Sequence, residues 1–179
     1  EALRNEYFAF QLGIFAYKMS IKNLQVKYSG LTSGDQKIPA TRFTCFNTGG
    51  VDPYGNSFVK KLDVDSGFVQ PLWIGIDIPE NTKPGKYTGT VTITTDNAEI
   101  QQINVGLEIK NEVLTDRGDS EPWRHSRLRW LNSSLGIDDL PTASYQAIRY
   151  VGENTYDFSG KLLKMAATGM PESISIYGT

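Results

Sequence analysis

One cysteine and one histidine occur among the 179 residues, and these scarcities exclude several kinds of site. A single cysteine, Cys45, cannot form a disulfide within the chain, and its neighbours Phe43 and Phe46 indicate a small buried residue in a strand. A zinc site of histidines and cysteines would lack ligands, and a Ser-His-Asp triad would depend on His125 alone. We therefore expect no metal site.

The chain also lacks a surplus of positive charge and any long apolar run. Its formal net charge is -2 and its pI is near 5.5, so we expect no nucleic-acid partner. No apolar run approaches the length of a transmembrane segment. The phosphate-binding patterns GxxxxGK and GxGxxG are missing from any strand-to-helix context, so we expect no cofactor. No signal peptide is visible, and the sequence starts inside an expected strand, which suggests a trimmed chain.

Alternating apolar residues are the main feature of the first part of the chain. Between residues 69 and 78 one face carries Leu72, Ile74, Ile76 and Ile78, and the other carries Trp73, Gly75 and Asp77. This period of two marks a strand with one face in a core. We predict strands at 7–16, 20–28, 40–47, 58–64, 69–78, 87–94 and 103–109, with turns at 31–36, 47–56 and Pro84-Gly85. About seven strands over residues 1–112 predict an all-β, immunoglobulin-like antiparallel β-sandwich.

The composition changes after residue 111, where arginines, tryptophans and acidic residues become frequent. Leu128, Leu131 and Leu135 fit a helical stripe with Ser120 as its cap, whereas residues 127–130 alternate like a strand. We therefore predict that residues 113–144 form an irregular strap with at most one short helix. Residues 145–179 are expected to form a short β segment with strands near 146–151, 155–158, 161–166 and 173–177. This segment is too short for its own core, so it packs on the first domain or begins a second β domain.

Carboxylate pairs are the first candidates for chemistry, because glycoside cleavage commonly uses two. The candidates are Asp63 with Asp65, Asp116 with Asp119 and Glu121, and Asp138 with Asp139. Their turn and loop contexts favour solubility and salt-bridge roles, so we predict no catalytic residue in this chain. Arg117-Gly118-Asp119 is written like an integrin ligand, but its charged surroundings favour an ordinary turn. Asn132-Ser133-Ser134 is a glycosylation sequon.

Aromatic residues are the candidates for glycan contact, because sugars stack their apolar faces on such rings. Trp73 faces away from the expected core, so it is either an exposed stacking surface or covered by another part of the chain. The segment with Trp123 and Trp130 is the expected cover. Together with Tyr54, these residues form the predicted carbohydrate-binding set: Trp73, Tyr54, Trp123 and Trp130.

Two blocks of sequence resemble the N-terminal region of large bacterial proteins related to glycoside hydrolase family 123. They are NTGGVDPYGNSFVKKLDVDSGFVQPLWIGIDIPENTKPGKYTGTVTI at 47–93 and DRGDSEPWRHSRLRWLNSSLGIDD at 116–139, of which RLRWLNS is the more distinctive part. The tail LLKMAATGMPESISIY resembles the start of the next β-rich module in such proteins.

The resemblance implies a secreted, periplasmic or cell-surface bacterial protein. Members of the family remove N-acetylgalactosamine with a downstream (β/α)-barrel that carries an adjacent Asp-Glu pair, assisted by the acetamido group of the substrate. This sequence contains neither a barrel pattern nor an Asp-Glu dipeptide, so no catalytic residue carries over.

The leading hypothesis is therefore a non-catalytic accessory β-sandwich that packs against and orients a downstream catalytic domain of the same parent glycoside hydrolase. Two alternatives stay open. One is a carbohydrate-binding module that uses exposed aromatic rings, and the other is an adhesion or interaction module. The sequence specifies neither the sugar and its linkage nor the oligomeric state.

Overall fold

The computed structural model describes residues 1–121, 123, 127–138 and 140–177. It divides the chain into two compact units, Glu1–Ser134 (unit 1) and Leu135–Thr179 (unit 2). Within the described residues, the regular structure consists of β-strands and short 3-10 turns, which confirms the predicted all-β class. None of the helical turns in these residues has the length and apolar character needed to cross a membrane.

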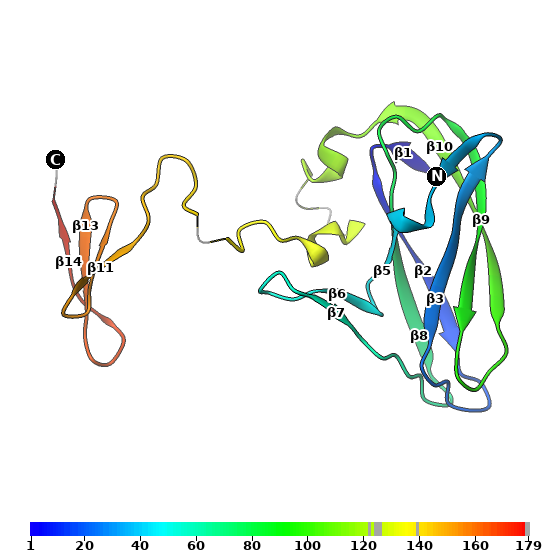
Figure 1. The fold of residues 1–179 in the computed structure, drawn as a ribbon, viewed down its shortest axis with the longest axis horizontal. Coiled ribbons are helices and arrows are strands. Elements are labelled where there is room, and N and C mark those ends of the chain that lie inside the picture. Colours follow the sequence, from blue (N-terminus) through cyan, green and yellow to red (C-terminus); the bar gives the residue numbers. More distant parts are fainter. Residues whose placement is uncertain (122, 124–126, 139, 178–179) are drawn as a thin grey trace. The chain divides into compact units, whose positions relative to one another are not determined.

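A five-stranded sheet forms one layer of unit 1 (Figure 1). Its strands are antiparallel except for β1, which runs parallel to β10 at the edge. A glycine-first, two-residue turn at Gly34-Asp35 joins β3 to β4, so both strands reach into the turn expected at 31–36. The strand order is β1 (Ala2–Arg4), β10 (Gln101–Val113), β9 (Gly85–Thr94), β3 (Gln25–Ser33) and β4 (Gln36–Ile38).

A three-stranded antiparallel sheet forms the second layer. Its order is β2 (Tyr7–Phe15), β8 (Val69–Asp77) and β5 (Phe43–Cys45), with β8 in the middle. β5 pairs only with residues 74–76 of β8, so Pro71 lies beyond its reach, opposite Gly13 of β2. That position has the edge character expected for a residue without an N–H group.

Apolar side chains from both sheets meet in the core, which makes unit 1 a β-sandwich. Ile74 and Ile76 of β8 are 0% exposed, and Cys45 of β5 is also buried. The alternation predicted for residues 72–78 and 87–93 is confirmed, because its apolar positions supply the core. The buried set includes Leu72, Ile74, Ile76 and Ile78 from one layer, and Tyr87, Val91, Ile93, Leu107 and Ile109 from the other.

Several expected boundaries are corrected by the structure. The strand expected at 40–47 shrinks to β5, because a 3-10 turn (Ala40–Arg42) follows Pro39. The strand expected at 20–28 begins only at Gln25. The strand expected at 58–64 ends at Val59, although Leu62 and Val64 are buried. The hydrogen-bonded turn before β9 spans residues 79–82, and Gly85, expected inside a type II turn, already begins the strand.

A further hairpin occupies part of the loop expected at 47–56. β6 (Gly49–Val51) and β7 (Ser57–Val59) pair with each other alone and extend away from the sandwich (Figure 1). A Cβ atom on Gly49 would lie 2.6 Å from the carbonyl oxygen of Phe58, so this close strand pairing requires glycine. The glycines also hide the alternation that would have predicted the hairpin.

Residues 114–134 of unit 1 are named the charged segment. Within its described residues, the charged segment contains the 3-10 turns η2 (Thr115–Gly118) and η4 (Arg129–Asn132).

Unit 2 is a single antiparallel sheet of four strands. They are β11 (Arg149–Gly152), β12 (Thr155–Phe158), β13 (Lys161–Met165) and β14 (Pro171–Ile176), close to the four short strands expected in the tail. On one face, Asp157 accepts hydrogen bonds from Tyr177 and Arg149, which together lower the pKa of its carboxyl group. The other face carries a hollow of about 640 Å³ lined mainly by apolar side chains, including Tyr156, Phe158 and Leu163.

Candidate functional site

The outer face of the three-stranded sheet, turned away from the core, holds the charged segment at one end. Asp77 at the end of β8 forms an ion pair with Arg42 at 2.7 Å and another with Arg117 of the charged segment. Burial, reinforced by the nearby guanidinium groups of Arg129 and Arg42, lowers the pKa of Arg117. The positive charges of these arginines are compensated by the carboxylates of Asp77 and Asp119.

A second set of contacts fixes the middle of the charged segment. The guanidinium group of Arg127 lies 3.5 Å from Glu6 and 3.7 Å from Glu121. Gly118 forms the surface beneath it, because a Cβ atom there would lie 2.5 Å from the Arg127 guanidinium carbon. Gly118 also has a φ of 85°, a left-handed conformation that favours glycine.

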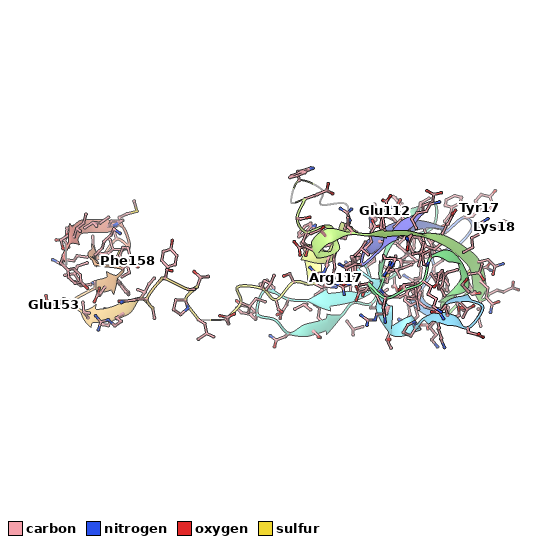
Figure 2. All side chains as sticks on the ribbon, turned by 90° about the horizontal axis from the view of Figure 1, so that it is seen from above. Tyr17, Lys18, Glu112, Arg117, Glu153 and Phe158 are labelled. Carbon is pink, nitrogen blue, oxygen red and sulfur yellow. The ribbon has the colours of Figure 1, made fainter. Side chains whose placement is uncertain are left out.

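The Arg117-Gly118-Asp119 tripeptide is thus part of this interface. Arg117 pairs with Asp77, Gly118 is buried beneath Arg127, and Asp119 pairs with Arg129. These contacts fit the ordinary turn expected from the sequence rather than a free loop tip. Figure 2 shows Arg117 on the charged segment, beside the sandwich.

At its other end, the same outer face carries described side chains that are exposed to solvent. We call this exposed end the outer patch. Its residues lie on, or directly follow, the outward positions of β2 and β8: Gly13, Phe15, Tyr17, Val69, Pro71 and Trp73. The sequence predicted the segment with Trp123 and Trp130 as a cover for Trp73, but Trp73 is 39% exposed and is therefore not fully covered. Its backbone N–H donates to the side-chain oxygen of Asn47 at 2.7 Å, and Gln11 lies opposite it in register. The indole is therefore held on a rigid strand.

Tyr54 stands at the tip of the β6–β7 hairpin and is 82% exposed. The Asp52 carboxylate accepts hydrogen bonds from the backbone N–H groups of Tyr54 at 2.9 Å and Asn56 at 2.8 Å. The hydrogen bonds from Asn56 and Tyr54 lower the pKa of Asp52, so the carboxylate stays charged at neutral pH. These hydrogen bonds fix the turn that presents the exposed Tyr54 ring. Contact of a ligand with the ring would therefore cost little loop entropy.

The two remaining predicted aromatics lie in the charged segment. Trp123 is 71% and Trp130 57% exposed, and Trp130 belongs to η4. The next residue but one, Asn132, accepts a hydrogen bond from the backbone N–H of Val51 at 3.2 Å and so ties η4 to the hairpin. The four predicted rings therefore come from three elements: β8, the hairpin tip and the charged segment.

Among the candidate carboxylates, Asp63, Asp119, Glu121 and Asp138 contact cations or backbone N–H groups. Asp63 pairs with Lys22 at 3.2 Å and accepts from the backbone N–H of Asn23, contacts that lower its pKa. Asp119 and Glu121 face arginines, as described above. Asp139 and His125 lie outside the described residues. Within the described part of the chain, no three His, Cys, Asp or Glu side chains are grouped to hold a metal ion.

Sequence reasoning missed Phe15, Tyr17 and Val69 as companions of Trp73. Phe15 and Tyr17 lie together, with ring centroids 5.6 Å apart, and Lys18 lies over the Tyr17 ring. Figure 2 shows Tyr17 and Lys18 beside each other at the margin of unit 1. The odd-numbered positions from Tyr7 to Phe15 pair with the outward positions of β8, and this register becomes visible only in the structure.

Comparisons with known proteins point to one family. The family profile of the glycoside hydrolase 123 N-terminal domain matches residues 44–95, which include the whole first block that carried the sequence resemblance. No curated protein matches the chain significantly.

Solved structures give weaker likenesses. A family 123 glycoside hydrolase from Clostridium perfringens is 20% identical with a TM-score of 0.47, and the match covers 63% of this chain and 22% of that chain. The chain thus spans about a fifth of that hydrolase. PapD-like domain 7 of human CEP192 is 14% identical with a TM-score of 0.35, covering 63% of this chain and 78% of that chain. Over residues 44–95, this chain is therefore similar to the N-terminal domain of glycoside hydrolase family 123.

Proposed function

We propose that this chain is a non-catalytic accessory β-sandwich of a larger glycoside hydrolase, where it packs against and orients a catalytic domain. The observation that carries the proposal is the match of residues 44–95 to the N-terminal domain of family 123. The engagement of Asp63, Asp119 and Glu121 with cations supports structural rather than catalytic roles for these carboxylates. The sheet orders β1-β10-β9-β3-β4 and β2-β8-β5 are compatible with an immunoglobulin-like sandwich.

The test compares the purified chain with the full product of its gene. We expect the isolated chain to release no chromophore from nitrophenyl N-acetyl-β-galactosaminide, and the parent protein to release it. Turnover by the isolated chain that disappears in Asp63→Asn or Glu121→Gln would contradict the non-catalytic role. A parent protein without glycosidase activity on any N-acetylhexosaminide would contradict the accessory role. Cell fractionation of the source bacterium, with the parent in the periplasm or medium, checks the proposed extracytoplasmic location.

Glycan binding is a second candidate, favoured by the locked turn that presents Tyr54. On a glycan array, Tyr54→Ala should lower binding by about tenfold, because a stacking ring typically contributes 1–2 kcal/mol. Phe68→Ala is the matched control, since Phe68 is also an exposed ring but lies directly before β8, away from the hairpin tip. Equal binding by both variants and the unchanged chain would rule out the Tyr54 ring as a sugar contact.

A further inference from the structure

The outer face of the three-stranded sheet is a protein interface along half of its length. Tyr7, Gly75 and Asp77 occupy this half, and the Tyr7 ring packs so closely on Gly75 that a Cβ there would lie 2.4 Å from it. Burial raises the pKa of the Tyr7 hydroxyl. The positive charge of Arg129, in the charged segment, acts on the same hydroxyl and lowers its pKa in part. With the Arg117–Asp77 pair, these contacts form a closed junction between sheet and charged segment.

The outer patch continues this interface along the same strands, and its side chains stay exposed among the described residues of unit 1. Phe15, Tyr17 and Val69 are 54%, 70% and 58% exposed, and Trp73 lies between them and the junction. Adjacent exposed apolar side chains on a flat, rigid sheet are unusual on a surface that stays in water. The apolar side chains at these positions therefore indicate that another molecule covers this surface.

The chemistry of the outer patch selects a protein over a glycan. Gln11 is the single polar side chain among its outward neighbours on β2 and β8 before the junction begins. A sugar brings a hydroxyl on nearly every carbon, and each needs a partner when water is removed. A patch made of Phe15, Val69, Pro71 and Trp73 supplies area but few partners, as in the core of a protein–protein interface.

We propose that the outer patch is the docking surface for the catalytic domain of the parent protein, with Trp73 as the anchor beside the junction. This inference rests on the accessory role proposed above. The surface of the catalytic domain that docks here is apolar at its centre. At its margin it carries a carboxylate that pairs with Lys18, which lies beside the Tyr17 ring. The domain extends the junction that the charged segment has already made on the same sheet, so both contacts fix one orientation of the sandwich.

Hydroxyl-radical footprinting of the isolated chain and of the full parent protein tests the proposal. In the parent, oxidation of Trp73, Phe15 and Tyr17 should fall by about fivefold or more, as expected for side chains that lose most of their solvent contact. Phe58 on β7 is an exposed ring away from the patch and should react equally in both proteins. An active parent in which Trp73 reacts as in the isolated chain overturns this inference and leaves the accessory role intact.

Two matched variants of the parent separate docking from folding. Val69→Asp places a charge in the outer patch, and Val59→Asp places one on β7, where the side chain is 88% exposed. We expect both isolated chains to unfold at unchanged urea midpoints, and only Val69→Asp to restore Trp73 oxidation in the parent. Equal protection of Trp73 in both variants contradicts the proposal. Protection of Trp73 in the isolated chain by an N-acetylgalactosamine-containing glycan also overturns it, because the patch would then be a sugar site.

Discussion

At the scale of single residues, Tyr28 carries a feature that costs stability. Its ring stacks on Phe43 in the core, with centroids 4.7 Å apart, but its hydroxyl oxygen has no hydrogen-bond partner among the described residues. Burial, followed by the nearby Cys45 and Tyr7 side chains, raises its pKa well above that of a free tyrosine. A buried hydroxyl without a partner loses its hydration energy on folding and regains little.

Replacement of Tyr28 by phenylalanine should therefore stabilise unit 1 by about 1 kcal/mol at neutral pH. Urea unfolding followed by fluorescence measures this difference. Tyr54→Phe is the matched control, because its ring is 82% exposed, and it should change stability by no more than about 0.5 kcal/mol. Destabilisation by Tyr28→Phe would show that the hydroxyl has a stabilising contact.

The buried tyrosines also set the response to alkaline pH. Burial raises the folded-state pKa of Tyr7, Tyr28 and Tyr87 above the usual value of 10.0. The folded state holds these protons more tightly, so stability is full below pH 10 and declines as the unfolded tyrosines ionise above it. Unfolding midpoints should fall between about pH 9 and pH 11, and less steeply in Tyr28→Phe. Equal slopes in both proteins would contradict the raised pKa of Tyr28.

At the scale of elements, the charged segment depends on one glycine. In Gly118→Ala the new Cβ would lie 2.5 Å from the Arg127 guanidinium carbon, and φ is 85° at this position. Arg127 must then leave Glu6, and the segment should open. We expect trypsin to cleave within residues 114–134 about tenfold faster than in the unchanged chain, since cleavage follows the population of the open form.

Gly106→Ala on β10 is the control for that experiment, because a Cβ there meets no atom within 4 Å. High salt should speed cleavage of the unchanged chain and of Gly106→Ala modestly, since it screens the exposed Arg129–Asp119 pair more than the largely buried Arg127–Glu6 pair. It should affect Gly118→Ala less, because that segment is already open. Equal cleavage of the two variants would mean that the close contact between Gly118 and Arg127 does not keep the charged segment closed.

Elements with a local pattern were predictable, and elements held by distant contacts were not. The alternation from Leu72 to Ile78 is enough to define a strand and its buried face, because every second side chain enters the core. The β6–β7 hairpin was missed because Gly49 and Gly50 carry no side chains to alternate. The course of the charged segment depends on Glu6 and Asp77, both far away in the sequence.

The same distinction holds for the candidate site. Trp73 was predictable as an outward residue from the period of its strand. Its companion Phe15 required the register between β2 and β8, which a single sequence does not encode locally. Asp77 was a usable signal, since an acidic residue in an apolar strand often marks an ion pair.

At the scale of the whole molecule, the buried apolar residues are unevenly shared. Among the described residues, every buried hydrophobic side chain belongs to unit 1, and the last of them in the sequence is Ile109. The sheet of unit 2 has an apolar face but no buried hydrophobic residue of its own among those described. A single layer of this kind has little independent stability in water.

A fragment of residues 1–134 should therefore unfold cooperatively at the urea midpoint of the full chain, because it keeps the entire described core. A fragment of residues 135–179 should show no cooperative transition. Circular dichroism in urea measures both. A loss of more than about 1 kcal/mol in the longer fragment would show that unit 2 contributes to the stability of the sandwich.

The parallel pairing of β1 with β10 determines how the sandwich bears mechanical load. Ala2 lies opposite Ile109 and Arg4 opposite Val113, and the N–H of Leu114 donates to Arg4 at 2.9 Å. Tension applied between the first residues and residue 114 pulls the two strands past each other along their axes. Their hydrogen bonds then share the strain simultaneously instead of opening one after another. Stretched in this direction, the sandwich acts as a stiff link between whatever is attached to its two ends.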